Sequence, residues 1–196
     1  MAARGAHAAA RLGKPLPAAR VLVNRRIDVA LAAGADGVHL GFDALAVEDA
    51  RELLPATAWI GRSLHSVSEI EQETAQTARS PRGIDYAHLA PIWDPLSKPA
   101  TRPSLGPAAL RAACAHGLPV IAQGGLDPER ARVAIDAGAA GIAVTGSVTR
   151  AKDPERTIRA LRDALDGASR GVSSRASLRG PTSAERQRDR SGTLRG

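Results

Sequence analysis

Between residues 21 and 165, six short apolar runs alternate with six longer helix-like segments, and this alternation constrains the fold most. The apolar runs are continuous, which is typical of strands buried on both faces. The strands that we predict are Val21–Asn24, Gly37–Leu40, Trp59–Ser63, Tyr86–Leu89, Val120–Gln123 and Gly141–Thr145. The helices that we predict are Ile27–Ala33, Val47–Leu54, Val67–Ala78, Pro107–His116, Pro128–Ala137 and Pro154–Leu165.

Two segments nearly repeat each other: residues 32–38 read AAGADGV and residues 136–142 read DAGAAGI. Each combines a helix end, a tight turn and a strand start, so the chain repeats a β/α unit and predicts a parallel sheet. A TIM-type (β/α)8 barrel is our first choice, and an open doubly wound sheet is the second. Only six units are visible, so we expect a barrel truncated at its N-terminus, with an Ala-rich helix over Ala2–Leu12 preceding Val21.

The length of 196 residues and the 43% hydrophobic content fit one domain, which we expect over residues 1–168. Residues 169–196 are rich in Ser, Arg and Gly, and this composition predicts a disordered tail. From residue 170 onward, seven arginines and two acids account for +5 of the net charge of +7. The body has no basic stripe, so no nucleic-acid partner is expected there, although the tail leaves open a weak contact with RNA or acidic surfaces.

The cysteine content bears on localisation. Cys114 is the only cysteine, which excludes an intramolecular disulfide and favours a reducing cytoplasm.

No apolar run approaches the roughly 20 residues that a membrane span needs. The five histidines show no metal-site spacing. We therefore expect small-molecule partners and no membrane, and leave a homo-oligomer open.

The ends of the predicted strands carry the candidate chemistry, because a β/α barrel binds its ligand there, often with a phosphate at the last two loops. These loops contain Gln123-Gly124-Gly125 and Thr145-Gly146, where glycines let backbone N–H groups approach an anion. For Gly124-Gly125 a plain strand-to-helix turn is the alternative. The loop after the fourth strand presents Lys98 among prolines 91, 95, 99 and 103, a stiff setting that suits an anionic ligand.

Other polar residues near strand ends favour structural roles. His39 lies inside an apolar strand and is expected to be a hydrogen-bonded structural histidine, and the facing of His88 stays open. No carboxylate is placed to form a triad with His65 and Ser66, so Ser66 is predicted to cap the helix that starts at Val67.

Taken in order, these residues resemble the thiamine phosphate synthase/TenI family over about residues 5–166. The matching landmarks are Asn24 with Asp28, residues 34–41 (GADGVHLG), residues 61–66 (GRSLHS), Asp85-Tyr86, Pro91-Ile92, Ser97-Lys98-Pro99, Leu105-Gly106, Gly124-Gly125 and the strand 141–145. The resemblance implies a β/α barrel that joins an aminopyrimidine diphosphate to a thiazole phosphate in thiamine biosynthesis, releases pyrophosphate and uses Mg²⁺.

The resemblance also assigns residues. It places Asn24, Ser63 and Lys98 at the pyrimidine diphosphate. It places the thiazole phosphate at the strand-end loops, with the residues Pro95, Leu96, Ser97, Gln123, Gly124, Gly125, Thr145 and Gly146. Such a reaction requires neutralisation of the leaving group and two ligands held face to face, without a covalent nucleophile.

The sequence departs from the family pattern in three places. Residues 1–20 contain no Gln-Leu-Arg-Glu-Lys type motif, which binds diphosphate in the family. The two usual Mg²⁺-binding aspartates correspond to Arg25 and Ala44, with Asp43 one place off as a weak metal candidate. We therefore hypothesise that Arg25 and Lys98 replace part of the metal charge, and predict catalytic roles for Lys98, Ser63 and Arg25.

The third departure is Pro91, which stands where the thiazole tautomerase branch has a catalytic histidine, so that activity is disfavoured. A non-catalytic relative that binds thiazole phosphate or thiamine phosphate, and an inactive truncated fragment, are the remaining alternatives.

Overall fold

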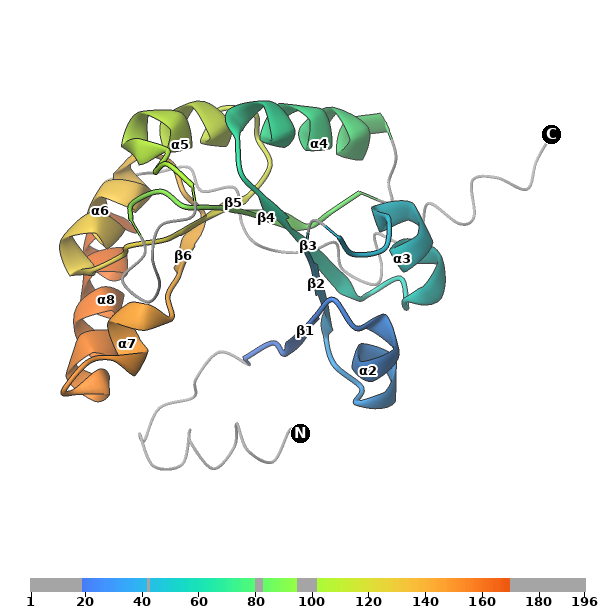
Figure 1. The fold of residues 1–196 in the computed structure, drawn as a ribbon, viewed down its shortest axis with the longest axis horizontal. Helices are drawn as coiled ribbons and strands as arrows, with labels where there is room; N and C mark the ends of the chain where they lie inside the picture. The colour runs from blue at the N-terminus through green and yellow to red at the C-terminus, as the bar shows by residue number, and fades with distance from the viewer. Residues whose placement is uncertain (1–18, 42, 80–82, 95–101, 170–196) are drawn as a thin grey trace.

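The computed structural model describes residues 19–41, 43–79, 83–94 and 102–169. Within these ranges the chain builds a six-stranded parallel sheet, in which the strands follow one another in chain order. The strands are β1 (Leu22–Asn24), β2 (Gly37–Leu40), β3 (Trp59–Leu64), β4 (Tyr86–Leu89), β5 (Val120–Gln123) and β6 (Gly141–Ala143). Figure 1 shows that the sheet is curled rather than flat.

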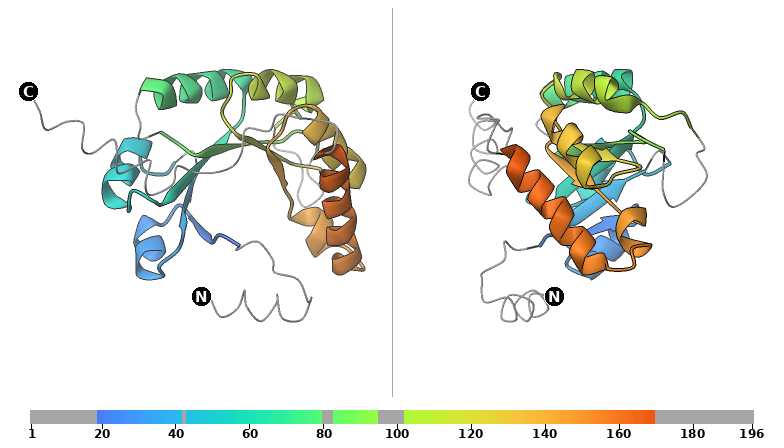
Figure 2. Two further views of the ribbon diagram at one scale, coloured as in Figure 1. Left: turned by 180° about the vertical axis from the view of Figure 1, so that it is seen from behind. Right: turned by 90° about the vertical axis from the view of Figure 1, so that its left-hand side faces the viewer.

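Helices connect successive strands or follow the last one, and they lie on the convex side of the curled sheet (Figures 1 and 2). They are α2 (Ile27–Ala32), α3 (Val47–Leu53), α4 (Val67–Arg79), α5 (Gly106–Cys114), α6 (Pro128–Asp136), α7 (Gly146–Thr149) and α8 (Pro154–Ser169). The predicted TIM-type fold with about six β/α units is confirmed. The helix predicted over Ala2–Leu12, and residues 170–196 of the predicted tail, lie outside the described residues.

The helix boundaries follow from local capping. Asp127, Asp153 and Ser66 each accept a hydrogen bond from a first-turn N–H, at 2.8, 2.9 and 3.1 Å. These caps satisfy backbone donors that have no partner inside the helix. The predicted cap at Ser66 is therefore confirmed.

The core lies between the sheet and the helices. Alternate strand residues point outward into it, and none of them is more than 5% exposed: Val38, Leu40, Ile60, Leu64, Ala87, Leu89, Val120 and Ala122. Burying an aliphatic side chain contributes roughly 1.5–3 kcal/mol each, so this layer provides much of the stability of the fold. The strand residues between them face the concave side of the sheet.

A buried ion pair ties α3 to the starts of β3 and β4. Arg51 Nη2 lies 2.7 Å from Asp85 Oδ2, and both side chains are 6% exposed. Arg51 also donates to the carbonyls of Ala58 and Gly83, while Asp85 accepts the N–H of Ile60. The pair thus supplies hydrogen-bond partners for buried backbone groups that would otherwise have none.

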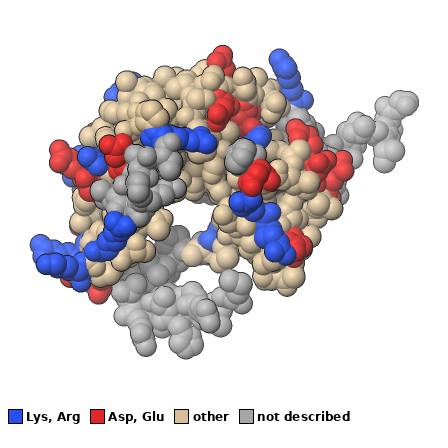
Figure 3. Space-filling view, in the orientation of Figure 1, with Lys and Arg blue, Asp and Glu red and all other residues tan. Residues whose placement is uncertain are grey.

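Among the helices of the described part, none is long and apolar enough to cross a membrane. On the face seen in Figure 3, basic and acidic side chains are interspersed.

Candidate functional site

The carboxyl ends of the parallel strands bring several predicted site residues to one edge of the sheet. Asn24 is the last residue of β1, and Ser63 is the last but one of β3. Gln123 is the last residue of β5 and is followed by Gly124-Gly125, while Thr145 is the N-cap of α7, which begins at Gly146. Pro95, Leu96, Ser97 and Lys98 lie outside the described residues.

Gly124 and Gly125 form a turn that packs against the loop after β4. Their φ angles are 101° and 59°, a region that favours glycine. A Cβ on Gly125 would lie 2.3 Å from the carbonyl oxygen of Asp94, and one on Gly124 would lie 3.0 Å from Pro91. The lack of side chains therefore serves close packing of two loops as well as the tight turn.

Of the described residues that flank segment 95–101, those before it are hydrogen-bonded to this turn, and Ser104 after it is hydrogen-bonded to Asp94. The N–H of Ile92 donates to the carbonyl of Gln123 at 2.8 Å, and Ser104 Oγ donates to Asp94 Oδ1 at 2.8 Å. The described residues on either side of the segment 95–101 therefore lie at the carboxyl edge of the sheet.

A TIM-type barrel interior is mostly filled with branched aliphatic side chains. Here the concave face carries polar side chains toward the carboxyl ends of the strands, next to an apolar cluster of Trp59, Tyr86 and Ile121. In register across four strands lie Asn24, His39, Gly61 and Tyr86, while Ser63 pairs with His88 in the next row. Such a face offers hydrogen-bonding groups to a ligand.

His39 connects the polar groups of this face. Its Nε2 lies 2.8 Å from Ser63 Oγ, and its Nδ1 lies 3.1 Å from Tyr86 Oη. The centroids of its ring and that of His88 are 4.3 Å apart. The expectation that His39 is a hydrogen-bonded strand histidine is confirmed, and the structure adds that His39 and His88 share the concave side.

These rings are neutral near pH 7. Burial, and then the charge of His88, lower the pKa of His39 to about 4. Burial also lowers the pKa of His88, against a hydrogen bond with Gln123 that raises it. Burial and the nearby Asp85 raise the pKa of Tyr86 to about 12, so its hydroxyl keeps its proton.

The low pKa of His39 makes stability depend on pH. The unfolded chain takes up this proton near pH 6.5 and the folded chain only near 4, so the folded state is disfavoured as pH falls between these values. Between pH 7.5 and pH 5 we expect His39, which is partly buried, to account for a loss of about 1 kcal/mol. Urea unfolding at both pH values should show a smaller loss for His39→Gln, and an equal loss would contradict the assignment.

Arg25 and Asp43 form an ion pair at this edge, with side chains 51% and 44% exposed. The backbone of Arg25 has a φ of 66°, and its N–H donates to the carbonyl of His39 at 2.9 Å. The Asp43 carboxylate is thus directed at a guanidinium. No group of three or more His, Cys, Asp or Glu in the described ranges could hold a metal ion. The residues here do not fit a divalent cation.

Two contacts in the site were not predicted from the sequence. Tyr86 crosses the strand β3 to reach His39, and only the neighbouring strand register shows this. Arg130, in the first turn of α6, donates to the carbonyl of Gly125 at 2.7 Å and lies over the Trp93 ring. An arginine two residues after an Asp-Pro helix start was the available sequence signal for the second feature.

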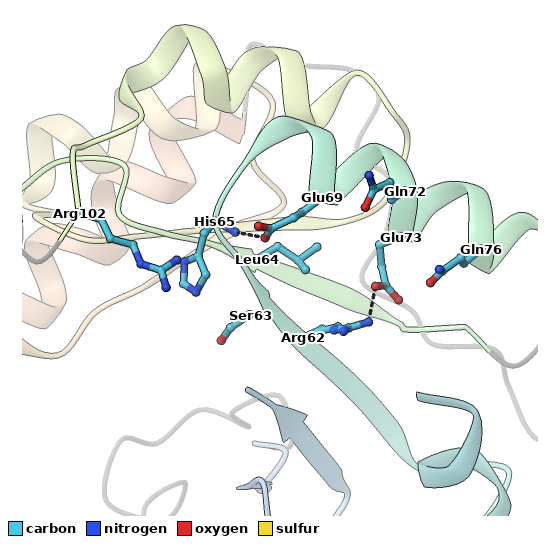
Figure 4. Close-up of a pocket in the computed structure, with 9 residues that line it drawn as sticks. All are labelled: Arg62, Ser63, Leu64, His65, Glu69, Gln72, Glu73, Gln76 and Arg102. Atoms are coloured by element: carbon cyan, nitrogen blue, oxygen red, sulfur yellow. Dashed lines mark hydrogen bonds and ion pairs between the residues drawn. The ribbon is translucent and has the colours of Figure 1, made fainter. Parts of the chain in front are cut away.

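A pocket of about 330 Å³, which shares Ser63 with the site described above, lies between β3 and α4 (Figure 4). Arg62 and Glu73 meet within it at 2.7 Å, and Glu69 accepts the backbone N–H of His65 at 2.6 Å. Burial raises the pKa of Glu73, although the charge of Arg62 opposes this. The residues that line the pocket are Arg62, Ser63, Leu64, His65, Glu69, Gln72, Glu73, Gln76 and Arg102.

The curled parallel sheet with polar strand ends at its carboxyl edge defines a protein of the β/α-barrel type, a class whose members bind their ligands at that edge. The sequence matches the family described as thiamine monophosphate synthase over residues 3–148, and the chain belongs to this family.

Several similar proteins have names that match this family. The chain is 39% identical over 155 residues to the thiamine-phosphate synthase of Natronomonas pharaonis, which covers 78% of this chain and 70% of that protein. It is 44% identical over 141 residues to the thiamine-phosphate synthase of Chlorobium luteolum, covering 71% of this chain and 64% of the relative. The solved thiamine phosphate pyrophosphorylase of Pyrococcus furiosus superposes with a TM-score of 0.64 at 30% identity, over 76% of this chain and 69% of that one.

Proposed function

We propose that the protein is a transferase of thiamine biosynthesis, which joins an aminopyrimidine diphosphate to a thiazole phosphate and releases pyrophosphate. One observation supports the proposal beyond family membership: the concave face carries His39, Ser63, Tyr86 and His88 beside its apolar cluster. A neutral, hydrogen-bonding wall of this kind suits a flat heterocycle with ring nitrogens and an amino group.

In the proposed reaction the carbon–oxygen bond to pyrophosphate breaks, and the thiazole nitrogen forms a bond to the resulting carbocation-like pyrimidine methylene. Asn24 and Ser63 would orient the pyrimidine, while Lys98 and Arg25 would neutralise the departing pyrophosphate. The turns at Gly124-Gly125 and Thr145-Gly146 would hold the thiazole phosphate. Holding both ligands face to face would provide most of the rate enhancement.

The decisive test is to incubate the full chain with both substrates and to measure thiamine phosphate and pyrophosphate together. Equal amounts of both products are expected, and Ser63→Ala and Lys98→Ala should each reduce the rate about 100-fold, since each removes a group that contacts the pyrimidine diphosphate. Formation of neither product, with both substrates stable and bound, would exclude the transferase.

A non-catalytic relative that binds thiazole phosphate or thiamine phosphate is the second candidate. The ion pair between Arg25 and Asp43 favours it, because a family transferase is expected to use Mg²⁺ and these residues do not fit the ion. Calorimetric titration separates the candidates: a pure binder should bind thiazole phosphate or thiamine phosphate and release no pyrophosphate from mixed substrates.

Arg25 gives a prediction about the metal. We expect Arg25→Ala to weaken the binding of sodium pyrophosphate about tenfold in the presence of EDTA, because a half-exposed guanidinium contributes roughly one charge-assisted hydrogen bond. Wild-type affinity should change little when Mg²⁺ replaces EDTA.

Arg26→Ala is the matched control, because the neighbouring Arg26 is directed at Asp28 instead. It should leave pyrophosphate binding unchanged. Strict dependence of wild-type binding on Mg²⁺, together with an unaffected Arg25→Ala variant, would show that a metal and not the guanidinium neutralises the diphosphate.

We also propose a cytoplasmic setting with small-molecule partners. The single cysteine, Cys114, is a free thiol on α5, and burial raises its pKa to about 11, so it stays protonated and unreactive. Thiol labelling in the native state should accordingly be slow.

A further inference from the structure

Three side chains from three neighbouring strands form a chain of hydrogen bonds across the concave face. Tyr86 on β4, His39 on β2 and Ser63 on β3 are linked through the two ring nitrogens of His39, at 3.1 and 2.8 Å. The hydrogen bond between Tyr86 and His39 passes over β3 at Gly61, which lies between them in register. A side chain at this position would block it, because a Cβ there would lie 2.1 Å from Tyr86 Cζ. Ser63 and His39 are partly exposed, whereas Tyr86 is buried.

The protonation states leave two ways to arrange the hydrogens. A neutral imidazole has one N–H donor and one bare nitrogen that accepts. Either Tyr86 donates to Nδ1 and Nε2–H donates to Ser63 Oγ, or Nδ1–H donates to Tyr86 and Ser63 donates to Nε2. The low pKa of His39 excludes a third arrangement, in which both nitrogens donate.

The surroundings of Tyr86 favour the first arrangement. Tyr86 is 9% exposed, and its raised pKa keeps the proton on the hydroxyl. Among the described residues, His39 is the hydrogen-bond partner of that hydroxyl. In the second arrangement the Tyr86 proton would be buried without an acceptor, which costs more than the hydrogen bond contributes.

We propose that Tyr86 and His39 are positioning residues that hold Ser63 as a hydrogen-bond donor, aimed at a ring nitrogen of the aminopyrimidine. With Nε2–H occupying a lone pair of Ser63 Oγ, the hydroxyl hydrogen is free for the ligand. A ring nitrogen without hydrogen accepts this bond, whereas an amino group or a ring C–H at the same place does not. The pyrimidine as ligand rests on the proposed function; the direction of the hydrogen-bond chain does not.

Nitrogen-15 NMR of the wild-type histidine side chains tests the direction without any ligand. Signals are assigned to His39 by their loss in His39→Gln. The expected result is a hydrogen on Nε2 and a bare Nδ1 at pH 7. A hydrogen on Nδ1 would overturn the proposal, because Ser63 would then donate to His39 and not to a ligand.

Binding measurements test the target. The probes are the aminopyrimidine diphosphate and its two analogues in which one ring nitrogen is replaced by C–H. One analogue should bind wild type about tenfold more weakly than the parent, which corresponds to one lost hydrogen bond. Ser63→Ala should bind that analogue and the parent equally.

Tyr86→Phe should reduce the preference for the parent several-fold, because it removes the donor that keeps Nδ1 bare. Combining it with Ser63→Ala should cause no further loss, since both act through one hydrogen bond. Ile121→Val, in the same concave cluster, is the matched control and should keep the full preference. Thiazole phosphate affinity should be unchanged in every variant that stays folded.

The two proposals fail separately. If wild type binds the parent and both analogues equally, Ser63 does not read a ring nitrogen, and the positioning role is wrong while the transferase function stands. If wild type binds no aminopyrimidine diphosphate at all, the proposed function fails, and the NMR result alone decides the direction of the chain.

Discussion

Replacing Arg51 with methionine is expected to destabilise the protein by about 3–5 kcal/mol, the largest effect of a single substitution that we predict. Arg51 and Asp85 are both 6% exposed. Removing the guanidinium leaves a buried carboxylate facing a side chain that cannot pair with it, and the carbonyls of Ala58 and Gly83 lose their donors. Urea denaturation measures the loss as a lower midpoint with an unchanged slope.

The matched control is Arg159→Met. Arg159 pairs with Glu155 one turn away on α8, but the side chains are 71% and 75% exposed, so the loss should stay below about 0.5 kcal/mol. If both variants lost the same stability, the burial of the Arg51 pair would not be what makes it important.

Gly61→Ala is expected to cost about 1–3 kcal/mol and to separate Tyr86 from His39. The added methyl group would lie 2.1 Å from Cζ and 2.4 Å from Oη of Tyr86, so the ring must move away from β3. Denaturation should show the lost stability. Nitrogen-15 NMR should show a changed His39 environment in the folded protein.

Gly41→Ala is the control for this substitution, because the nearest atom to a Cβ there is 3.6 Å away. Its stability should match wild type within about 0.5 kcal/mol. A Gly61→Ala protein with wild-type stability and an unchanged His39 signal would show that Tyr86 does not depend on the space above Gly61.

The strands were predictable because each is a continuous apolar run bounded by turn residues. β2, β4 and β5 begin and end where the sequence predicted. β6 is shorter than the predicted strand over 141–145, because its neighbour β5 ends at Gln123, which pairs with Ala143. Beyond Ala143 the ladder has no partner strand among the described residues, and the backbone turns into α7, a helix that the sequence did not predict.

From the sequence, the candidate site could be predicted only as the carboxyl edge of the sheet. Because parallel strands end together, Asn24, Ser63 and Gly124 were placed at one rim from their positions in the repeat. The ion pair of Arg25 with Asp43 and the reach of Tyr86 to His39 depend on which strands are neighbours and in which register. A pattern with a period of two assigns a residue to a face of its own strand and contains no information on register.

The sequence by itself determined the β/α repeat, the parallel sheet and the family, because apolar periodicity, helix caps and strand-end motifs are local signals. The tertiary structure alone decided that Gly61 is the space through which Tyr86 reaches His39, and that Asp43 faces a guanidinium. These contacts join residues 18 and 47 positions apart, and only the packing of neighbouring strands brings them within hydrogen-bond distance.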